Sequence, residues 1–283
     1  MTHITRRTFL KTGAAAGLAA ATPLLAAPPP ADGLFPARPN FHNTPGASVM
    51  ISGGSITRDE RFLPAVSEVQ KRHYAGRKRI LLILHASLPA DRDRMEQRLQ
   101  AMFAADGFDA YSLHHLSDGA ARRRIETAEA IFVGGGETFL LLRTLLEERQ
   151  LRPLRAAVLG GTPFHGTSAG ANIAGPHIGC TNDFPVVDVP SRAALGVFPA
   201  VINPHHPRTD EPDFGGRSHK IRSYLRANPG ETVLGLGNAA IARLHATRVE
   251  ISLQAAFLYQ QGGSRELALG EVGELSSLVS YRA

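Results

Sequence analysis

The pentapeptide Gly166-Thr-Ser-Ala-Gly170 constrains this chain most strongly, because glycines around a serine favour a sharp turn between a strand and a helix. Residues 162–165 before it can form the strand, and the small residues 169–174 after it can begin the helix. Ser168 would then stand at the tip of the turn with its hydroxyl exposed, as in a nucleophile elbow. An ordinary glycine-flanked turn has the same pattern, so other parts of the sequence must decide between the two interpretations.

Apolar segments alternate with helical ones on both sides of this turn. Met95, Leu99, Met102 and Phe103 recur at helical spacing and are expected to face a sheet. The expected strands are residues 48–52, 79–85, 108–113, 130–133 and 232–236, and the expected helices are a segment ending at Tyr74 and residues 120–128, 140–146 and 218–226. Residues 249–254 alternate like a half-exposed hairpin strand. This order predicts an α/β fold in which helices cover both faces of a mostly parallel central sheet.

The N-terminus has the pattern of an export signal. Thr5 to Lys11 resembles the twin-arginine consensus, and the mild apolar run 14–21 that follows is too short for a membrane span. We therefore expect a signal at 1–27, a proline-rich leader at 28–46 and one domain at 47–283. The twin-arginine export machinery would carry the folded protein to the periplasm or the cell exterior, with no stable membrane anchor.

Composition excludes other classes of protein. The net charge is +6, and Arg6, Arg7 and Lys11 of the expected signal supply three of these charges. The net positive charge that remains without the signal is too small for a nucleic-acid-binding protein. Cys180 is the only cysteine, so no intrachain disulfide can form, and its thiol is expected to be packed in the core.

A run of three glycines, Gly134 to Gly136, lies between an expected strand and a leucine-rich helix. It does not match a dinucleotide fingerprint, because Phe139 stands where the last glycine would be, and no Walker lysine follows. We therefore expect no cofactor. The loop can still present a backbone N–H to an oxyanion, or it can be a plain tight turn.

His205 and His206 lie in a loop bracketed by prolines, directly after the apolar run 197–202. Polar groups at strand ends converge in α/β folds, so a histidine 37 residues after Ser168 can act as its base. A metal site is the competing interpretation, with acids nearby at positions 210, 211 and 213. No histidine pair has helical or strand ligand spacing, and zinc would need a better-defined set of ligands, so we expect no metal.

Four motifs stand out along the chain: Val133-Gly-Gly-Gly-Glu-Thr-Phe139, Gly166-Thr-Ser-Ala-Gly-Ala-Asn172, Thr181-Asn-Asp-Phe-Pro185 and Ile202-Asn-Pro-His205. Together they resemble the peptidase E family of aspartyl dipeptidases, which is related to cyanophycinase. The family has a class I glutamine-amidotransferase-like, flavodoxin-like fold, a three-layer α/β/α sandwich, and the likeness runs from about residue 48 to about 260.

The resemblance implies a role for each motif. Ser168 would be the nucleophile and His205, not His206, the general base. The backbone N–H groups of Gly136 and Ala169 would form the oxyanion hole. A serine at the elbow argues against amidotransferase chemistry, which uses a cysteine there.

Two positions depart from the family pattern. Glu137 replaces an asparagine beside the expected oxyanion hole, where its charge would oppose an oxyanion unless it is turned away or paired. Asn238 stands where relatives carry an acid that orients the histidine, and an amide oxygen can accept from imidazole without supplying a charge. Asp183 is the other candidate for a third catalytic residue, and we hypothesise that it orients His205 or binds the substrate's amino terminus.

The resemblance implies a serine exopeptidase that cleaves short peptides with an N-terminal aspartate through an acyl-enzyme. Arg217 aligns with the arginine suited to bind the aspartate side chain, because guanidinium and carboxylate pair in a bidentate manner. A cyanophycinase-like hydrolase of the aspartate-arginine polymer is an alternative. A catalytically weakened relative that only binds peptides is another, motivated by Glu137 and Asn238.

Overall fold

The computed structural model describes residues 47–245 and 248–274. The expected signal at 1–27 and the leader at 28–46 lie outside the described residues, as do residues 275–283 of the expected domain. No helix in the described part of the chain is long and apolar enough to cross a membrane.

The main sheet has eight strands in the order β14-β11-β10-β1-β7-β6-β4-β5. The five neighbours β1, β7, β6, β4 and β5 are all parallel, whereas β10, β11 and β14 add antiparallel pairs at the edge beside β1. Their bounds are β1 Ser48–Ser52, β4 Arg79–Ile83, β5 Asp109–Ser112, β6 Ala130–Val133, β7 Phe164–Thr167, β10 Ile241–His245, β11 Arg248–Ser252 and β14 Val272–Glu274. The mostly parallel α/β fold is confirmed, and the expected hairpin strand is β11.

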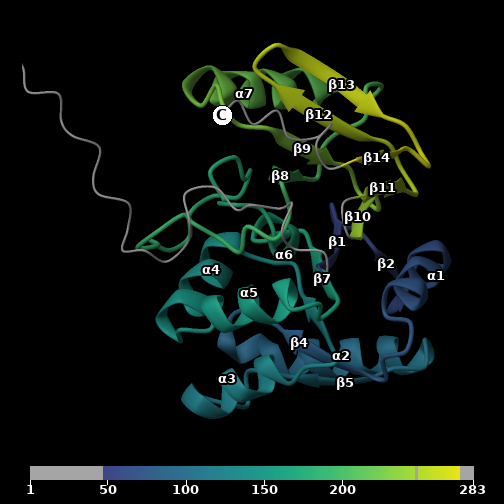
Figure 1. Cartoon of the computed structure of the whole chain (residues 1–283), viewed down its shortest axis with the longest axis vertical. Coiled ribbons are helices and arrows are strands. Elements are labelled where there is room, and N and C mark those ends of the chain that lie inside the picture. Colours follow the sequence, from purple (N-terminus) through teal and green to yellow (C-terminus); the bar gives the residue numbers. More distant parts are fainter. Residues whose placement is uncertain (1–46, 246–247, 275–283) are drawn as a thin grey trace, which may run out of the picture. The chain divides into compact units, whose positions relative to one another are not determined.

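Helices cover both faces of this sheet (Figure 1). Along β4, Ile80 and Leu82 pack into a core with α1 and α2, while Leu81 and Ile83 pack on the other side with α3, α4 and α5. This alternation gives the three layers of an α/β/α sandwich. The helix bounds are α1 Pro64–His73, α2 Arg92–Ala105, α3 Asp118–Glu126, α4 Thr138–Glu147 and α5 Leu151–Leu159, and a short 3-10 turn, Pro89–Asp91, precedes α2.

The first helix is shorter than the sequence predicts. Strands β2, Thr57–Arg58, and β3, Arg61–Phe62, form a small hairpin before it, with positive φ at Asp59 and Glu60 in the turn. Pro64 then begins α1, a position where a missing backbone N–H costs little. A polar segment read as helical therefore forms a turn instead.

A second sheet, not predicted as such from the sequence, has the order β13-β12-β9-β8 and carries helix α7 against it (Figure 1). Its elements are β8 Val201–Pro204, α7 Phe214–Ala227, β9 Val233–Leu236, β12 Ala256–Gln260 and β13 Gly263–Leu267. Cys180 is buried in the core between them, where burial raises the pKa of its thiol to about 11. The expectation that Cys180 is a packing residue is confirmed, since the thiol stays protonated at neutral pH.

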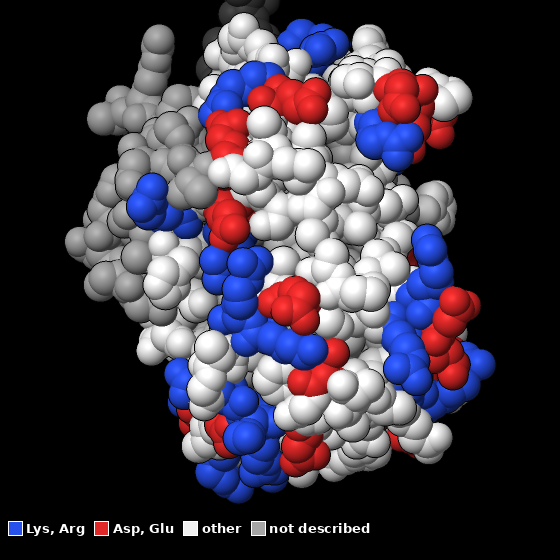
Figure 2. All heavy atoms as spheres, turned by 90° about the vertical axis from the view of Figure 1, so that its right-hand side faces the viewer, with Lys and Arg blue, Asp and Glu red and all other residues white. Residues whose placement is uncertain are grey.

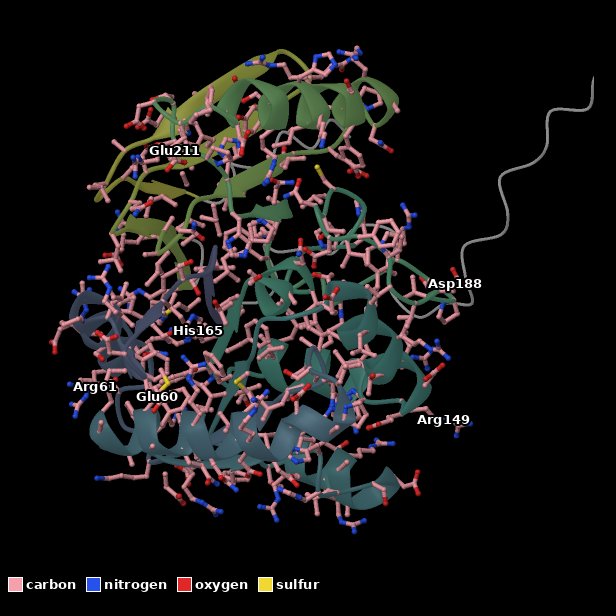
Figure 3. All side chains as sticks on the ribbon, turned by 180° about the vertical axis from the view of Figure 1, so that it is seen from behind. Glu60, Arg61, Arg149, His165, Asp188 and Glu211 are labelled. Atoms are coloured by element: carbon pink, nitrogen blue, oxygen red, sulfur yellow. The ribbon has the colours of Figure 1, made fainter. Side chains whose placement is uncertain are left out.

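Buried histidines fix part of the interior. His165 of β7 lies inside the molecule, whereas Arg61 and Arg149 project outward (Figure 3). The two ring nitrogens of His165 form hydrogen bonds with Ser52 Oγ at 3.0 Å and with Gln70 Nε2 at 3.2 Å. Burial keeps the pKa of His165 well below its usual value. These side chains tie β1 and α1 to β7 as neutral hydrogen-bonding groups.

Charged side chains of both signs share the surface. On the face drawn in Figure 2, lysines and arginines lie beside aspartates and glutamates. Exposed pairs of this kind, such as Arg122 with Glu126 at 2.7 Å, contribute at most about 1 kcal/mol each. The core, and not these pairs, holds the fold together.

Candidate active site

The carboxyl ends of five strands meet at one place in the structure. The residues that follow them are Gly53 and Gly54 after β1, Gly134 to Gly136 after β6, Ser168 after β7, His205 after β8 and Asn238 after β9. Backbone contacts join the two sheets here, since Ala239 N donates to Gly54 O at 2.7 Å. The site is thus built where α/β folds usually bind ligands, beyond the carboxyl ends of the strands.

Ser168 occupies the tip of the turn predicted from the sequence. Its φ of 52° and ψ of −108° are strained for a residue with a side chain, and helix α6, Ala169–Asn172, begins directly after it. A Cβ on Gly166 would lie 2.2 Å from Gly170 O, and a Cβ on Gly170 would lie 2.3 Å from Val133 O, so both positions require glycine. The local geometry is that of a nucleophile elbow.

The imidazole of His205 is placed by its backbone and by a glycine beneath it. The φ of His205 is 105°, and its N–H donates to Leu236 O at 2.9 Å. A Cβ on Gly54 would lie 2.0 Å from the Cε1 atom of the ring. The ring therefore fills the space that the absent side chain of Gly54 leaves.

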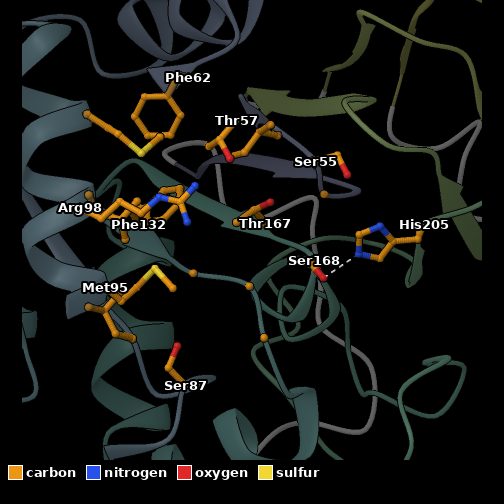
Figure 4. Close-up of a pocket in the computed structure, with 18 residues that line it drawn as sticks. Ser55, Thr57, Phe62, Ser87, Met95, Arg98, Phe132, Thr167, Ser168 and His205 are labelled. Atoms are coloured by element: carbon orange, nitrogen blue, oxygen red, sulfur yellow. Dashed lines mark hydrogen bonds between the residues drawn. The ribbon is translucent and has the colours of Figure 1, made fainter. Parts of the chain in front are cut away.

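A chain of hydrogen bonds links Ser168, His205 and Asn238. Ser168 Oγ lies 2.9 Å from His205 Nε2 (Figure 4), and His205 Nδ1 lies 2.6 Å from Asn238 Oδ1. Asn238 Oδ1 also accepts a hydrogen bond from Ser55 Oγ at 3.1 Å. Because an amide oxygen only accepts, Nδ1 carries the proton and Nε2 is free to accept the hydroxyl proton of Ser168.

Asp183, the other candidate third residue, lies at a different place. Its Oδ2 accepts a hydrogen bond from Thr138 N at 3.1 Å, at the first turn of α4. Asn172 Nδ2 binds the hydroxyls of both Thr138 and Thr181, which fixes the surrounding loop. The structure thus brings Asn238 to His205, and it places Asp183 at the start of α4, the helix that follows the glycine loop. Sequence alone could not separate the two, because the choice depends on where β9 ends.

The glycine loop lies over Ser168. A Cβ on Gly135 would be 3.1 Å from Ser168 Cβ, and Gly136 has a φ of 134° that suits glycine. Among the described residues, no acceptor takes the backbone N–H of Gly136 or Ala169. Both groups can therefore donate to a charge that develops beside Ser168 Oγ. Glu137 is exposed at the N-terminus of α4 and does not line the cavity at Ser168.

A cavity of about 220 Å³ opens in front of Ser168 and His205 (Figure 4). Helix α2 supplies one wall through Met95, Arg98 and Met102. Arg98 is the only lysine or arginine among the lining residues in the described part of the chain, and its guanidinium points into the cavity. Sequence reasoning missed Arg98, although it shares a helix face with the apolar residues identified on α2.

Arg217 lines a separate cavity of about 380 Å³, together with Lys220. Its Nη1 donates to Asn203 Oδ1 at 3.0 Å and to the backbone carbonyls of Pro204 and His205 at 3.3 and 3.4 Å. Burial lowers its pKa, but the guanidinium remains protonated. Arg217 therefore supports the backbone that carries His205.

His206 is a core histidine. Its Nδ1 donates to Pro207 O at 2.7 Å, its Nε2 accepts from the Tyr259 hydroxyl at 2.8 Å, and burial lowers its pKa to about 4. Arg208 pairs with both Asp210 and Glu211. The two ring nitrogens of His206 are occupied by protein groups, and Asp210 and Glu211 pair with Arg208 and not with a histidine. The geometry of this loop therefore gives no support to a metal site.

The imidazole of His205 is thus placed to deprotonate the hydroxyl of Ser168, and an α/β protein with this arrangement at the carboxyl edge of its sheet is a serine hydrolase. The sequence shows to which family of serine hydrolases the chain belongs. The chain belongs to peptidase family S51, which it matches over residues 48–252.

Individual relatives agree with this assignment. Peptidase E of Streptomyces coelicolor is 37% identical over 201 residues, which are 68% of this chain and 79% of that protein. Peptidase E of a Nostoc species is 27% identical over 221 residues, 77% of this chain and 90% of that protein. The crystal structure of a peptidase from an acI-B1 actinobacterium has the same fold, with a TM-score of 0.63 and 17% identity over 81% of this chain and 96% of that one.

The N-terminus also matches a known pattern. Residues 3–23 match the signal sequence of the twin-arginine translocation pathway. The chain is therefore an S51 serine peptidase with a twin-arginine export signal.

Proposed function

We propose that this chain is an exported exopeptidase that cleaves short peptides with an N-terminal aspartate. The observation that carries the proposal is the hydrogen bond between Ser168 Oγ and His205 Nε2 at the floor of a small cavity. This pair can supply both proton transfer and nucleophilic attack, the two steps that cleavage of a peptide bond through an acyl-enzyme requires.

The reaction follows from the positions of these atoms. His205 Nε2 accepts the proton of Ser168 Oγ while the oxygen attacks the main-chain carbonyl carbon of the N-terminal aspartate. The N–H groups of Gly136 and Ala169 donate to the oxyanion, and one such donor is typically worth about 10²- to 10³-fold in rate. His205 then gives its proton to the departing amine, and water hydrolyses the acyl-enzyme by the same route. Asn238 keeps the imidazole in the reactive tautomer throughout.

The substrate class rests on relatives and on the cavity. The relatives reported above are Peptidase E proteins. A volume of about 220 Å³ suits a small substrate, since drug-sized sites typically occupy about 300–1,000 Å³. The cavity offers a guanidinium, Arg98, for a carboxylate.

A cyanophycinase-like activity is the alternative. It requires acidic subsites for the arginine side chains of the polymer, and the described residues that line the cavity include no aspartate or glutamate. We therefore expect hydrolysis of Asp-Leu and none of the aspartate-arginine polymer when the two are assayed side by side. The reverse preference would replace the proposal.

Two arginines compete to bind the aspartate side chain of the substrate. We expect Arg98→Gln to reduce the preference for Asp-Leu over Asn-Leu by about tenfold or more, because a charge-assisted hydrogen bond contributes about 1.5–3 kcal/mol. Arg217→Gln should instead lower kcat for both substrates, since Arg217 supports the backbone of His205. Steady-state kinetics with both dipeptides decides, and loss of the preference only in Arg217→Gln would assign the aspartate to Arg217, as the resemblance implies.

The roles of Asn238 and Asp183 can be separated in the same way. We expect Asn238→Ala to lower kcat about 5- to 10-fold with little change in KM, because it removes one neutral hydrogen bond worth about 1 kcal/mol. Asp183→Ala should raise KM if Asp183 binds the substrate's amino terminus. An Asp183→Ala variant within a few-fold of wild type in both constants would leave Asp183 with neither of its proposed roles.

The place of action follows from the signal. We propose that the mature peptidase works on small peptides in the periplasm or outside the cell. Fractionation of cells into cytoplasm, periplasm and medium, followed by the Asp-Leu assay, tests this. Replacing both Arg6 and Arg7 by lysine should keep the activity in the cytoplasm.

A further inference from the structure

Four side chains with metal-binding atoms meet at the surface, away from the residues of the serine site. Asp93 and Glu96 come from the first turns of α2, and His114 and His115 follow β5. One ligand atom of each lies within 4.8 Å of those of the others. None of these residues lines the cavity at Ser168.

The separations between these atoms suit a tetrahedral ion. His114 Nε2 lies 2.9 Å from Asp93 Oδ1 and 4.0 Å from Glu96 Oε2, and His115 Nε2 lies 2.5 Å from Glu96 Oε2. Zinc bonds of about 2.0–2.1 Å in a tetrahedron place neighbouring ligand atoms about 3.4 Å apart. The distances between ligand atoms in the cluster, 2.5 to 4.0 Å, lie on both sides of this value. Small side-chain rotations would therefore bring the four ligand atoms to the distances that a bound ion requires.

Groups behind the cluster hold two of the four ligands in place. Glu96 Oε1 accepts hydrogen bonds from Ser112 N at 2.8 Å and from Gln100 Nε2 at 3.2 Å, which leaves Oε2 directed at the histidines. His114 Nδ1 lies 2.5 Å from Ser112 Oγ, whose hydroxyl can donate to Leu82 O at 3.4 Å. Metal-binding carboxylates and histidines are typically supported by such outer hydrogen bonds.

Zinc binding is compatible with these supporting contacts. Nε2 of His114 now lies 2.9 Å from Asp93 Oδ1 in a hydrogen bond, and an ion bound to Nε2 would take the place of that proton. Nδ1 of His114 would then carry the ring proton and donate to Ser112 Oγ, whose hydroxyl can donate in turn to Leu82 O. Two carboxylates and two imidazoles that bind as neutral ligands would give the site a charge of −2, which a divalent ion balances.

We propose that Asp93, Glu96, His114 and His115 form a zinc site that ties the start of α2 to the segment after β5. Two nitrogen and two oxygen ligands suit zinc better than magnesium or calcium, which prefer oxygen alone. The expectation of a chain without metal, drawn from the residues around His205, did not consider this cluster. The ion would steady α2, whose next turn carries Arg98 into the catalytic cavity.

The test uses the mature protein, freed of any affinity-tag histidines and treated with EDTA. Titration with Zn²⁺ by calorimetry should give one equivalent bound with a Kd below about 1 μM, as expected for four protein ligands. Co²⁺ should give the visible absorption of a tetrahedral site. The Tm of the wild-type protein should rise with Zn²⁺, because the ion binds the folded state.

Variants at the two exposed ligands keep the test clear of folding defects. The side chains of Asp93 and His115 are 76% and 55% exposed, so Asp93→Asn and His115→Gln should fold normally. Each should weaken Zn²⁺ binding by more than about 100-fold, beyond the 10- to 100-fold typical of outer groups.

Two controls locate the ion. His219→Gln, at an exposed histidine of α7, should bind Zn²⁺ like wild type, and so should Ser168→Ala, which would place the ion away from the catalytic serine. Failure of the wild-type protein to bind one equivalent, or equal binding in Asp93→Asn and His115→Gln, would overturn the proposal.

Discussion

Ser168→Ala is expected to lower kcat for Asp-Leu by about 10⁶-fold, the size of effect seen when a serine hydrolase loses its nucleophile. The remaining groups, the oxyanion donors and His205, can still bind the peptide, but no oxygen is left to form the acyl-enzyme. KM should therefore change little. Release of free leucine from Asp-Leu, measured over hours at high enzyme concentration, gives the residual rate.

A matched serine controls for the loss of a hydroxyl. Ser223 lies on α7, where its Oγ accepts a hydrogen bond from Arg226 at 2.8 Å, and Ser223→Ala should keep full activity. If Ser168→Ala retained more than about 1% of wild-type kcat, Ser168 could not be the nucleophile. A wild-type protein without any hydrolysis would instead favour the weakened, peptide-binding relative.

Gly54→Ala should reduce kcat/KM by at least about 100-fold, although Gly54 carries no reactive group. Its new Cβ would lie 2.0 Å from His205 Cε1, so the ring must move by about 1 Å or more, and a displacement of that size can cost about 10²-fold. The hydrogen bond to Ser168 at 2.9 Å cannot survive such a shift. Kinetics with Asp-Leu measures the loss.

Gly76→Ala is the matched control for Gly54→Ala. Gly76 also has a positive φ, 79°, but a Cβ there meets no atom within 4 Å. Both variants therefore bear backbone strain, and only Gly54→Ala displaces a catalytic group. Thermal unfolding should show similar losses of stability from the strain, while activity should fall only in Gly54→Ala. Near-normal activity of Gly54→Ala would mean that the position of the His205 ring is not decisive.

The parts of the site that could be predicted are those encoded in short contiguous segments. The elbow at Ser168 and the glycine loop each require a particular backbone, so glycine must appear at fixed places next to a strand. His205 follows its own strand directly. Because each segment ends a strand of an α/β fold, their convergence could be expected before any distance was known.

The remaining parts depend on packing between distant segments. Gly54 and Ser55 matter only because β1 lies next to the end of β9, and Arg98 matters only because α2 crosses the mouth of the cavity. The sequence offered both Asn238 and Asp183 as the third catalytic residue. Only the position at which β9 ends determines that Asn238 lies within hydrogen-bond distance of His205. The second sheet was missed because β12 pairs with β9, and β13 with β12, only after the chain has returned from the main sheet.

The position of β1 has a consequence for synthesis. This strand leaves the ribosome early, yet it pairs with β7 on one side and with β10, residues 241–245, on the other. The nascent chain therefore cannot assemble its catalytic groups until almost every residue has been translated. Since twin-arginine export carries proteins that are already folded, we expect the peptidase to become competent in the cytoplasm, after translation and before translocation. Cytoplasmic peptides that fit its cavity would then be exposed to it during that interval.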